Sequence, residues 1–192
     1  CLKRFERGFA TLSGLSLAVG VAVMRALEDV GISGAGLKWP NDVLAGDAKL
    51  AGILVELSGE YQGPCTAVIG IGLNVRMPQA LRDRAGQAVT DLADLAGGAP
   101  PSRNRVTACL VARLRESLLE FERDGFAAFR DDYARYDVLR GRAVCLSGAC
   151  DGFEGVASGV DARGALRVRG DDGEIVVDSA EVTVRRHAEL AR

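Results

Sequence analysis

The pattern of apolar residues changes near residue 139, and this change limits the folds open to the chain. Before it, residues 15–30 are apolar on nearly every side of a helix, which is typical of a helix buried on most faces. After it, five short apolar stretches alternate with glycine-containing turns within about 50 residues. The pattern predicts an α+β chain with a helix-backed sheet domain at residues 1–138 and a small β-barrel at residues 139–192.

Capping residues give the expected ends of the helices. Ser13 is the expected N-cap of the first helix, and Gly31 is expected to end it. A polar segment with several glycines follows residue 76, and we interpret it as a mobile loop. Ser102 should cap a long helix, and Gly125 should separate it from the next. The expected helices cover residues 15–30, 91–95, 102–124 and 126–136.

The strands of the first part are expected to form an antiparallel meander backed by the first helix. One strand should run from residue 37 to 44 with an interruption at Pro40, because proline removes a ladder donor. Turns are expected at residues 45–48 and 61–64. The other strands of this meander and the five strands of the second part are expected at residues 50–57, 66–75, 143–146, 155–157, 165–168, 174–177 and 182–184.

Composition excludes several classes of function. The formal net charge of −2 and an aromatic content of 5% argue against bulk nucleic-acid binding and against a stacking platform for single strands. No run of about 18 apolar residues occurs, so no transmembrane helix is expected. No signal peptide precedes the first helix, and a cytoplasmic location is therefore expected.

The five cysteines are scattered, and none is part of a Cys-x-x-Cys pair. With a single histidine, His187, the chain offers no zinc-ligand pattern. We interpret the cysteines as reduced residues of the core. No protein side chains are assigned to a metal. The cysteines are Cys1, Cys65, Cys109, Cys145 and Cys150.

Only three of the 24 basic residues are lysines, and two of them, Lys38 and Lys49, lie within twelve residues of each other. Lys38 begins a dense group of functional residue types. Lys38, Trp39, Pro40, Asn41 and Asp42 are consecutive. Pro40 favours an extended, bent backbone, which could direct the two residues after it into a cleft. A surface turn with a half-buried tryptophan is the competing interpretation.

A second group lies on the return strand. Strict alternation would place Lys49 with Ala51, Ile53 and Val55 on one face of this strand. Gly52 and Leu54 would then lie on the other face. A glycine inside a strand contributes nothing to packing, so Gly52 suggests the close approach of a ligand.

A third group is Gly70, Gly72 and Asn74, which lie on one face of the next strand. Glycines on two neighbouring strands can form a flat slot for a planar ligand. A dinucleotide-binding loop is excluded because the third glycine is missing and no helix follows directly.

The three groups, in this order and spacing, resemble the biotin–protein ligase family. The resemblance extends over nearly the whole chain, from the first helix to the terminal barrel. It implies a class II synthetase-like ligase domain followed by a small SH3-like barrel. It also implies a two-step reaction: biotin and ATP form biotinyl-5′-adenylate, and the biotinyl group then passes to a lysine of a carrier domain.

The resemblance implies roles for individual residues. Lys49, Asp42 and Asn41 match catalytic positions, with Lys49 between the biotin carboxylate and the α-phosphate. Asp42 matches a carboxylate that receives the proton of the acceptor lysine. The biotin slot would be lined by Lys49, Gly52, Leu54 and Gly70. The ATP site would comprise Lys38, Trp39, Asn41, Asn74 and Arg185.

The substrates and partners implied by the resemblance are biotin, ATP with Mg²⁺, and the biotin carboxyl carrier domain of acetyl-CoA carboxylase. A homodimer is an open alternative, no membrane partner is expected, and nucleic acid would be bound only through an upstream helix-turn-helix. The family's arginine- and glycine-rich biotin loop is not found in these residues. We therefore expect a piece of a longer protein, which by itself need not be active.

Two other functions stay open at this point. Lipoate or octanoate–protein ligases share the fold and also place a lysine at an acyl phosphate. A non-enzymatic domain that binds biotinyl-adenylate and acts as a repressor is the second. The lysine-tryptophan-proline-asparagine-aspartate group and the terminal barrel favour biotin over lipoate.

Overall fold

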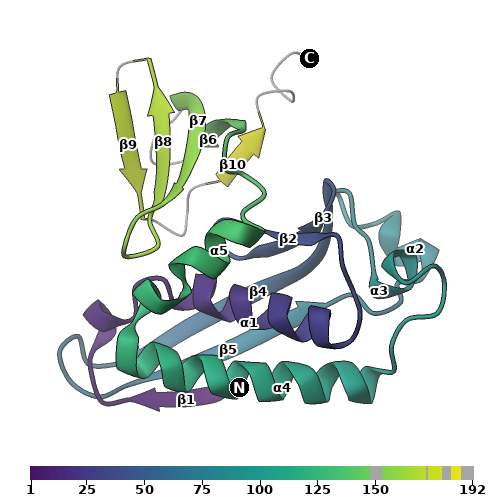
Figure 1. Ribbon diagram of the computed structural model, residues 1–192, viewed down its shortest axis with the longest axis horizontal. Helices are drawn as coiled ribbons and strands as arrows, with labels where there is room; N and C mark the ends of the chain where they lie inside the picture. The colour runs from purple at the N-terminus through teal and green to yellow at the C-terminus, as the bar shows by residue number, and fades with distance from the viewer. Residues whose placement is uncertain (148–152, 172, 179–182, 187–192) are drawn as a thin grey trace.

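Two five-stranded antiparallel sheets, one in each part of the chain, organise the structure (Figure 1). The computed structural model describes residues 1–147, 153–171, 173–178 and 183–186. The first sheet has the strand order β1-β5-β4-β3-β2. Its strands are β1 (Leu2–Phe5), β2 (Ala35–Lys38), β3 (Asp42–Ala45), β4 (Ala48–Gly59) and β5 (Cys65–Leu73). The predicted meander is confirmed.

The prediction of one interrupted strand over residues 37–44 is wrong. The chain reverses at the cis Trp39–Pro40 peptide, and β2 and β3 pair with each other as an antiparallel hairpin. Lys38 is thereby paired directly with Asp42. Pro40 does not merely interrupt a strand: the chain turns back at this position and brings Lys38 and Asp42, at the two strand ends, together.

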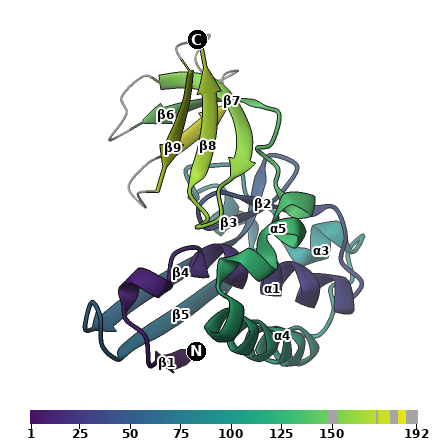
Figure 2. The ribbon, with the colours of Figure 1, turned by 60° about the vertical axis from the view of Figure 1, so that its left-hand side comes forward.

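Helices cover one face of the first sheet (Figures 1 and 2). Helix α1 lies against β2 and β4, and α4 and α5 pack beside it. Two short helices, α2 and α3, lie beyond the end of β3. The helices are α1 (Leu15–Asp29), α2 (Gln79–Arg82), α3 (Leu92–Leu95), α4 (Arg103–Asp124) and α5 (Arg130–Tyr136), with 3₁₀ turns at Phe9–Thr11 and Phe126–Phe129.

Helix α1 is buried on most sides, as predicted, and both of its ends are built on glycine. Its N-cap is Gly14, which has a φ of +79°, so the expected cap at Ser13 is wrong. Its C-terminal end follows the prediction. Gly31, with a φ of +81°, donates to the Glu28 carbonyl, and Ile32 donates to the Leu27 carbonyl. This is the Schellman pattern of a helix end.

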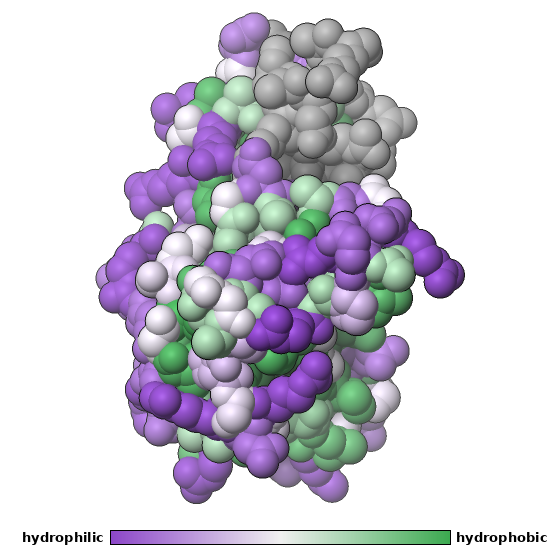
Figure 3. All heavy atoms as spheres, turned by 90° about the vertical axis from the view of Figure 1, so that its right-hand side faces the viewer, coloured by the Kyte–Doolittle hydropathy of each residue, from purple (hydrophilic) through white to green (hydrophobic). Residues whose placement is uncertain are grey.

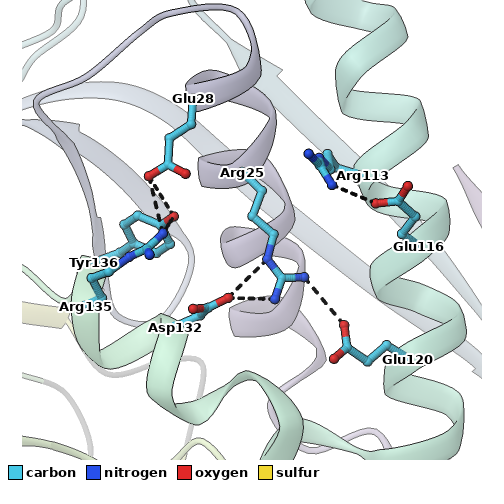
Figure 4. A network of polar contacts seen from close by, with 8 residues as sticks. All are labelled: Arg25, Glu28, Arg113, Glu116, Glu120, Asp132, Arg135 and Tyr136. Atoms are coloured by element: carbon cyan, nitrogen blue, oxygen red, sulfur yellow. Dashed lines mark hydrogen bonds and ion pairs between the residues drawn. The ribbon is translucent and has the colours of Figure 1, made fainter.

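A charged network joins helices α1, α4 and α5 on their outer side (Figure 4). Arg25 of α1 donates to Asp132 of α5 at 2.6 Å and forms an ion pair with Glu120 of α4 at 3.5 Å. Its guanidinium also lies 5.6 Å from the Phe129 ring centre. These contacts fix the helical layer that supports the first sheet.

The second sheet has the order β10-β6-β7-β8-β9. The five predicted strands are found, but the described pairings form an open series, and closure into an SH3-like barrel stays a prediction. The boundary at residue 139 also stays a prediction. The strands are β6 (Ala143–Ser147), β7 (Phe153–Val160), β8 (Leu166–Gly170), β9 (Gly173–Val177) and β10 (Thr183–Arg186). Cys150, Val182 and His187 lie outside the described residues.

Several sequence expectations can be compared with the described part of the chain. Its helices include none long and apolar enough to cross a membrane. Its Cys, His, Asp and Glu side chains form no group of three suited to a metal ion. Cys65 and Cys145 are buried as predicted, whereas Cys1 is exposed.

Candidate active site

A row of paired residues crosses the first sheet on the face opposite α1. Lys38 pairs with Asp42, Asp42 with Gly52, and Gly52 with Gly72. Directly paired residues point to the same face of a sheet. Residues from the first two sequence groups and one glycine of the third therefore meet on one surface.

Lys49 joins this surface because of a β-bulge. The register between β3 and β4 shifts so that Leu44 faces Lys49 while Val43 faces Ala51. The extra residue reverses the direction of the side chain before it. Our expectation that Lys49 shares a face with Ala51 is therefore wrong, and Lys49 lies over Gly52.

The Lys49 ammonium is 2.6 Å from Asp42 Oδ1 in an ion pair. Both side chains are partly exposed, at 29% and 21%. A Cβ atom on Gly52 would lie 3.3 Å from the Lys49 Cε, so glycine leaves room for the lysine stem. The pair presents a positive and a negative group side by side at an accessible surface.

The backbone of Lys49 is held independently of its side chain. Its N–H donates to the Ala88 carbonyl at 2.9 Å, and its carbonyl accepts from the Thr90 N–H at 3.0 Å. Asn74 donates from its side-chain amide to the Lys49 and Thr90 carbonyls at 3.4 and 3.0 Å. Asn74 is predicted to belong to the ATP site. In the structure, its side-chain amide joins the end of β5 to the segment beside Lys49.

Asn41 also holds the backbone in place. Its amide donates to the Ile53 carbonyl at 2.9 Å, and its own carbonyl accepts from the Ile53 N–H at 2.8 Å. These two bonds tie the hairpin turn to β4. Asn41 therefore fixes the position of the neighbouring Asp42.

Beside the ion pair, β4 and β5 present a floor almost without side chains. A Cβ atom on Gly70 would touch only Leu54 atoms, at 3.9 Å, and one on Gly72 would touch only the Gly52 carbonyl at the same distance. Neither position has a positive φ. Leu54 borders this floor and is 59% exposed. Packing and backbone conformation therefore do not explain these glycines.

The predicted ATP-site residues differ in their relation to this surface. Trp39 is 4% exposed and belongs to the core, with its indole N–H directed at the Gly164 carbonyl of the β7–β8 turn. Arg185 lies in β10, where it pairs with Cys145 in the second sheet, and its side chain is outside the described part. Lys38 lies on the site face at the end of β2.

The helix predicted at residues 91–95 is found as α3, whereas the segment before it, interpreted as a mobile loop, contains the short helix α2. Asp91 is 1% exposed, caps α3 by accepting from the Asp94 N–H, and also accepts from the Met77 N–H. Arg82 of α2 forms ion pairs with Asp91 at 2.5 Å and with Asp94 at 2.7 Å. The end of the molecule that carries α2 and α3 shows hydrophilic and apolar residues intermixed (Figure 3). The contacts of Arg82 with Asp91 and Asp94 were not predicted, because no local pattern marks ion pairs between residues nine and twelve positions apart.

Replacement of Asp91 by asparagine should lower the free energy of unfolding by about 1–3 kcal/mol at neutral pH, because buried donors lose an acceptor. Burial opposes ionisation of Asp91, but the N–H groups of Met77 and Asp94 and the Arg82 guanidinium hold its pKa below the ordinary value. The stabilisation is therefore present above about pH 4 and is lost as the pH falls through the lowered pKa.

Urea unfolding between pH 2 and 7, a range set about the ordinary aspartate pKa, measures this effect. The difference between wild type and Asp91→Asn should be largest at neutral pH and should shrink in acid. Asp83→Asn is the control, since Asp83 forms an exposed hydrogen bond with Gln79. A difference that stays constant over this range would exclude the carboxylate charge as its cause.

Comparison with known proteins identifies the family that the chain is similar to. The Biotin/lipoate A/B protein ligase family model matches residues 6–74. The matched segment is assigned to this family on that similarity, and relatives and solved structures extend the similarity over most of the chain. A second model, the Biotin protein ligase C terminal domain, matches residues 151–185, which agrees with the biotin branch of the family.

Individual relatives support the assignment. The bifunctional ligase/repressor BirA of Escherichia coli (strain K12) is 35% identical over 185 residues, which are 93% of this chain and 57% of BirA. The biotin--[acetyl-CoA-carboxylase] ligase of Mycobacterium tuberculosis is 35% identical over 172 residues, 88% of this chain and 61% of that protein. The chain therefore spans less than two thirds of the length of these relatives.

Solved structures show the same fold. The biotin protein ligase from Aquifex aeolicus in complex with biotin and ATP superimposes with a TM-score of 0.79 at 27% identity. The match covers 96% of this chain and 78% of that one. The α+β class with a small second sheet is thereby confirmed.

Proposed function

We propose that this chain carries the catalytic face of a biotin–protein ligase, which activates biotin with ATP and transfers it to a lysine of a carrier domain. The observation that carries the proposal is the glycine floor of Gly52, Gly70 and Gly72 beside the Lys49–Asp42 ion pair. A flat, accessible floor next to a paired cation and carboxylate suits a compact ring system whose carboxylate stands at the end of a flexible chain.

The first step needs positive charge where negative charge accumulates. Attack of the biotin carboxylate on the α-phosphate of ATP forms biotinyl-5′-adenylate and releases pyrophosphate. Lys49 would lie between the two anionic groups, where a compact ammonium stabilises the transition state. Lys38, on the same face, is proposed to contact the nucleotide, with Asn74 beside the adenine and Arg185 at the phosphates.

The second step needs a proton acceptor. The ε-amine of the carrier lysine attacks the mixed anhydride, AMP leaves, and the amine proton must be taken up. Asp42 is proposed to receive that proton, with Asn41 holding the turn that positions it. Mg²⁺, bound to the ATP phosphates, would supply additional charge neutralisation. The proposed carrier is the biotin carboxyl carrier domain of acetyl-CoA carboxylase, as the name of the mycobacterial relative suggests.

Lipoate or octanoate transfer is the second candidate, because the family model covers both chemistries. The match to the biotin protein ligase C-terminal domain favours biotin. Exchange of radioactive pyrophosphate into ATP, measured with biotin, lipoate or octanoate, tests the choice. Exchange that depends on lipoate or octanoate and not on biotin would contradict the proposal.

Replacement of Gly70 by valine should block the floor without unfolding the protein. A Cβ atom at this exposed position would meet only Leu54, at ordinary contact distance, so thermal stability should be nearly unchanged. Biotin affinity should fall at least about tenfold, because the side chain fills space needed by the ring. Calorimetric titration of biotin into the product of the complete reading frame measures the loss.

Thr66→Val is the matched control for this variant. Thr66 lies on the same face of β5, four residues before Gly70, and is paired with Ser58 away from the ion pair. Its replacement should leave biotin affinity unchanged. If Gly70→Val binds biotin with unaltered affinity, the glycine floor is not part of the biotin site.

A further inference from the structure

The tryptophan of the polar group at residues 38–42 has no role in the proposed chemistry, although it is the only tryptophan in the chain. Its indole N–H donates to the Gly164 carbonyl at 3.0 Å, in a buried bond that links two residues 125 positions apart. Gly164 belongs to the turn between β7 and β8 of the second sheet. Trp39 thus contacts the second sheet from the strand pair that carries Lys38 and Asp42.

The turn that carries Gly164 is well defined. Asp161 accepts from the N–H groups of Arg163 and Ala165 at 2.8 and 2.9 Å through its side chain. Its backbone carbonyl accepts from the Gly164 N–H at 3.1 Å. These bonds hold the turn in the conformation that directs the Gly164 carbonyl toward the indole.

Glycine is required on both sides of this contact. A Cβ atom on Gly164, whose φ is +86°, would lie 2.9 Å from the Gly14 Cα and 3.0 Å from Leu17. A Cβ atom on Gly14, the N-cap of α1, would lie 3.0 Å from the Arg163 carbonyl and 2.6 Å from Phe126. The two backbones therefore approach as closely as glycine permits, at the point where Trp39 adds its hydrogen bond.

The connection continues from Trp39 to the site. Two residues before the tryptophan, the Leu37 carbonyl accepts from the Val138 N–H, in the segment between α5 and β6, at 3.0 Å. Between them, Lys38 is paired with Asp42, which forms the ion pair with Lys49. The same short hairpin thus contacts the second sheet through Trp39 and the segment leading to it through Leu37, and places Lys38 and Asp42 on the catalytic face.

We infer that Trp39 is a positioning residue that docks the second sheet against the first through the Gly164 carbonyl. The docking contact itself does not depend on the proposed function, whereas its effect on ATP binding rests on that function. Since the proposed phosphate ligand Arg185 lies in the second sheet, docking brings that sheet to the ATP end of the site. Loss of the contact weakens ATP binding and leaves the biotin floor intact.

Fluorescence tests the docking itself, independently of any activity. As the single tryptophan of the 192-residue chain, Trp39 reports on its own contact. Gly164→Ala should shift its emission to longer wavelength and increase quenching by acrylamide, because the added methyl group separates the two backbones. Gly31→Ala is the matched control: its φ of +81° gives the same backbone cost, but nothing lies within 4 Å of its Cβ position. Equal spectra for the two variants would overturn the docking contact.

Kinetics test the consequence in the product of the complete reading frame. Gly164→Ala and Trp39→Phe, which keeps a ring but loses the N–H donor, should each raise the KM for ATP about tenfold, the loss expected for one buried hydrogen bond. The KM for biotin should stay within about twofold, a change too small to correspond to a lost hydrogen bond. Equal increases in both KM values, or none, would overturn the positioning role. A wild-type protein without biotin-dependent activity would contradict the proposed function, and fluorescence would then decide the docking contact alone.

Discussion

Replacement of Lys49 by alanine should reduce biotin-dependent ATP–pyrophosphate exchange by more than about 100-fold. The ammonium lies on the accessible face of the sheet, 2.6 Å from Asp42 and directly over Gly52. Removing a preorganised positive charge next to the reacting phosphate costs about 3–4 kcal/mol of transition-state stabilisation. The backbone of Lys49 keeps its bonds to Ala88 and Thr90, so the local fold should survive the substitution.

Lys3→Ala is the matched control for this prediction. Lys3 also forms an ion pair of 2.6 Å, with Glu122, and its side chain has a similar exposure of 24%. It lies on β1, at the opposite edge of the sheet from β2. Its loss should leave exchange unchanged. Near-normal exchange in Lys49→Ala, with correct folding shown by circular dichroism, would remove Lys49 from the first step.

The fold was largely predictable because its signals are local. Apolar residues on every side of residues 15–30 require a buried helix wherever it packs, and Gly31 ends it with a backbone conformation that few other residues adopt. The tight turn between β3 and β4 was predictable for the same reason, since Gly46 has a φ of +58°. Such features depend on a few neighbouring residues only.

The geometry of the site was less predictable because it depends on register. Alternation along β4 indicates the wrong face for Lys49, since the bulge opposite Val43 and Leu44 adds one residue. Nothing in the sequence of one strand specifies a bulge that arises from pairing with another. The sequence indicates which residues of β4 belong to the site, whereas the face of the sheet on which the Lys49 side chain lies is known only from the structure.

Trp39 shows a different limit. The family resemblance implies a direct part for Trp39 in the ATP site. The structure buries the ring and directs its N–H at a residue 125 positions away. Long-range contacts of this kind leave no local pattern, so a residue within a functional group can serve packing between two parts of the chain.

Replacement of Asp42 by asparagine should separate the two steps of the reaction. Asparagine has nearly the same shape and keeps an oxygen near Lys49, so binding of biotin and ATP and formation of the adenylate should persist. It cannot take up a proton from the carrier lysine, whose ordinary pKa of about 10.4 leaves the amine protonated at neutral pH. Transfer should therefore slow by about 10²–10⁴-fold, the usual contribution of a general base.

Each step can be measured separately in the same Asp42→Asn protein. Pyrophosphate exchange reports adenylate formation, and chemically prepared biotinyl-5′-adenylate supplied with the carrier domain reports transfer alone. Glu122→Gln is the control, because it neutralises the carboxylate of the other 2.6 Å lysine pair far from the site and should change neither step. The opposite pattern, in which exchange collapses while transfer from supplied adenylate stays normal, would assign Asp42 to the nucleotide or its metal. The Lys49–Asp42 pair would then act only in adenylate formation, because transfer would proceed without Asp42 as the acceptor of the amine proton.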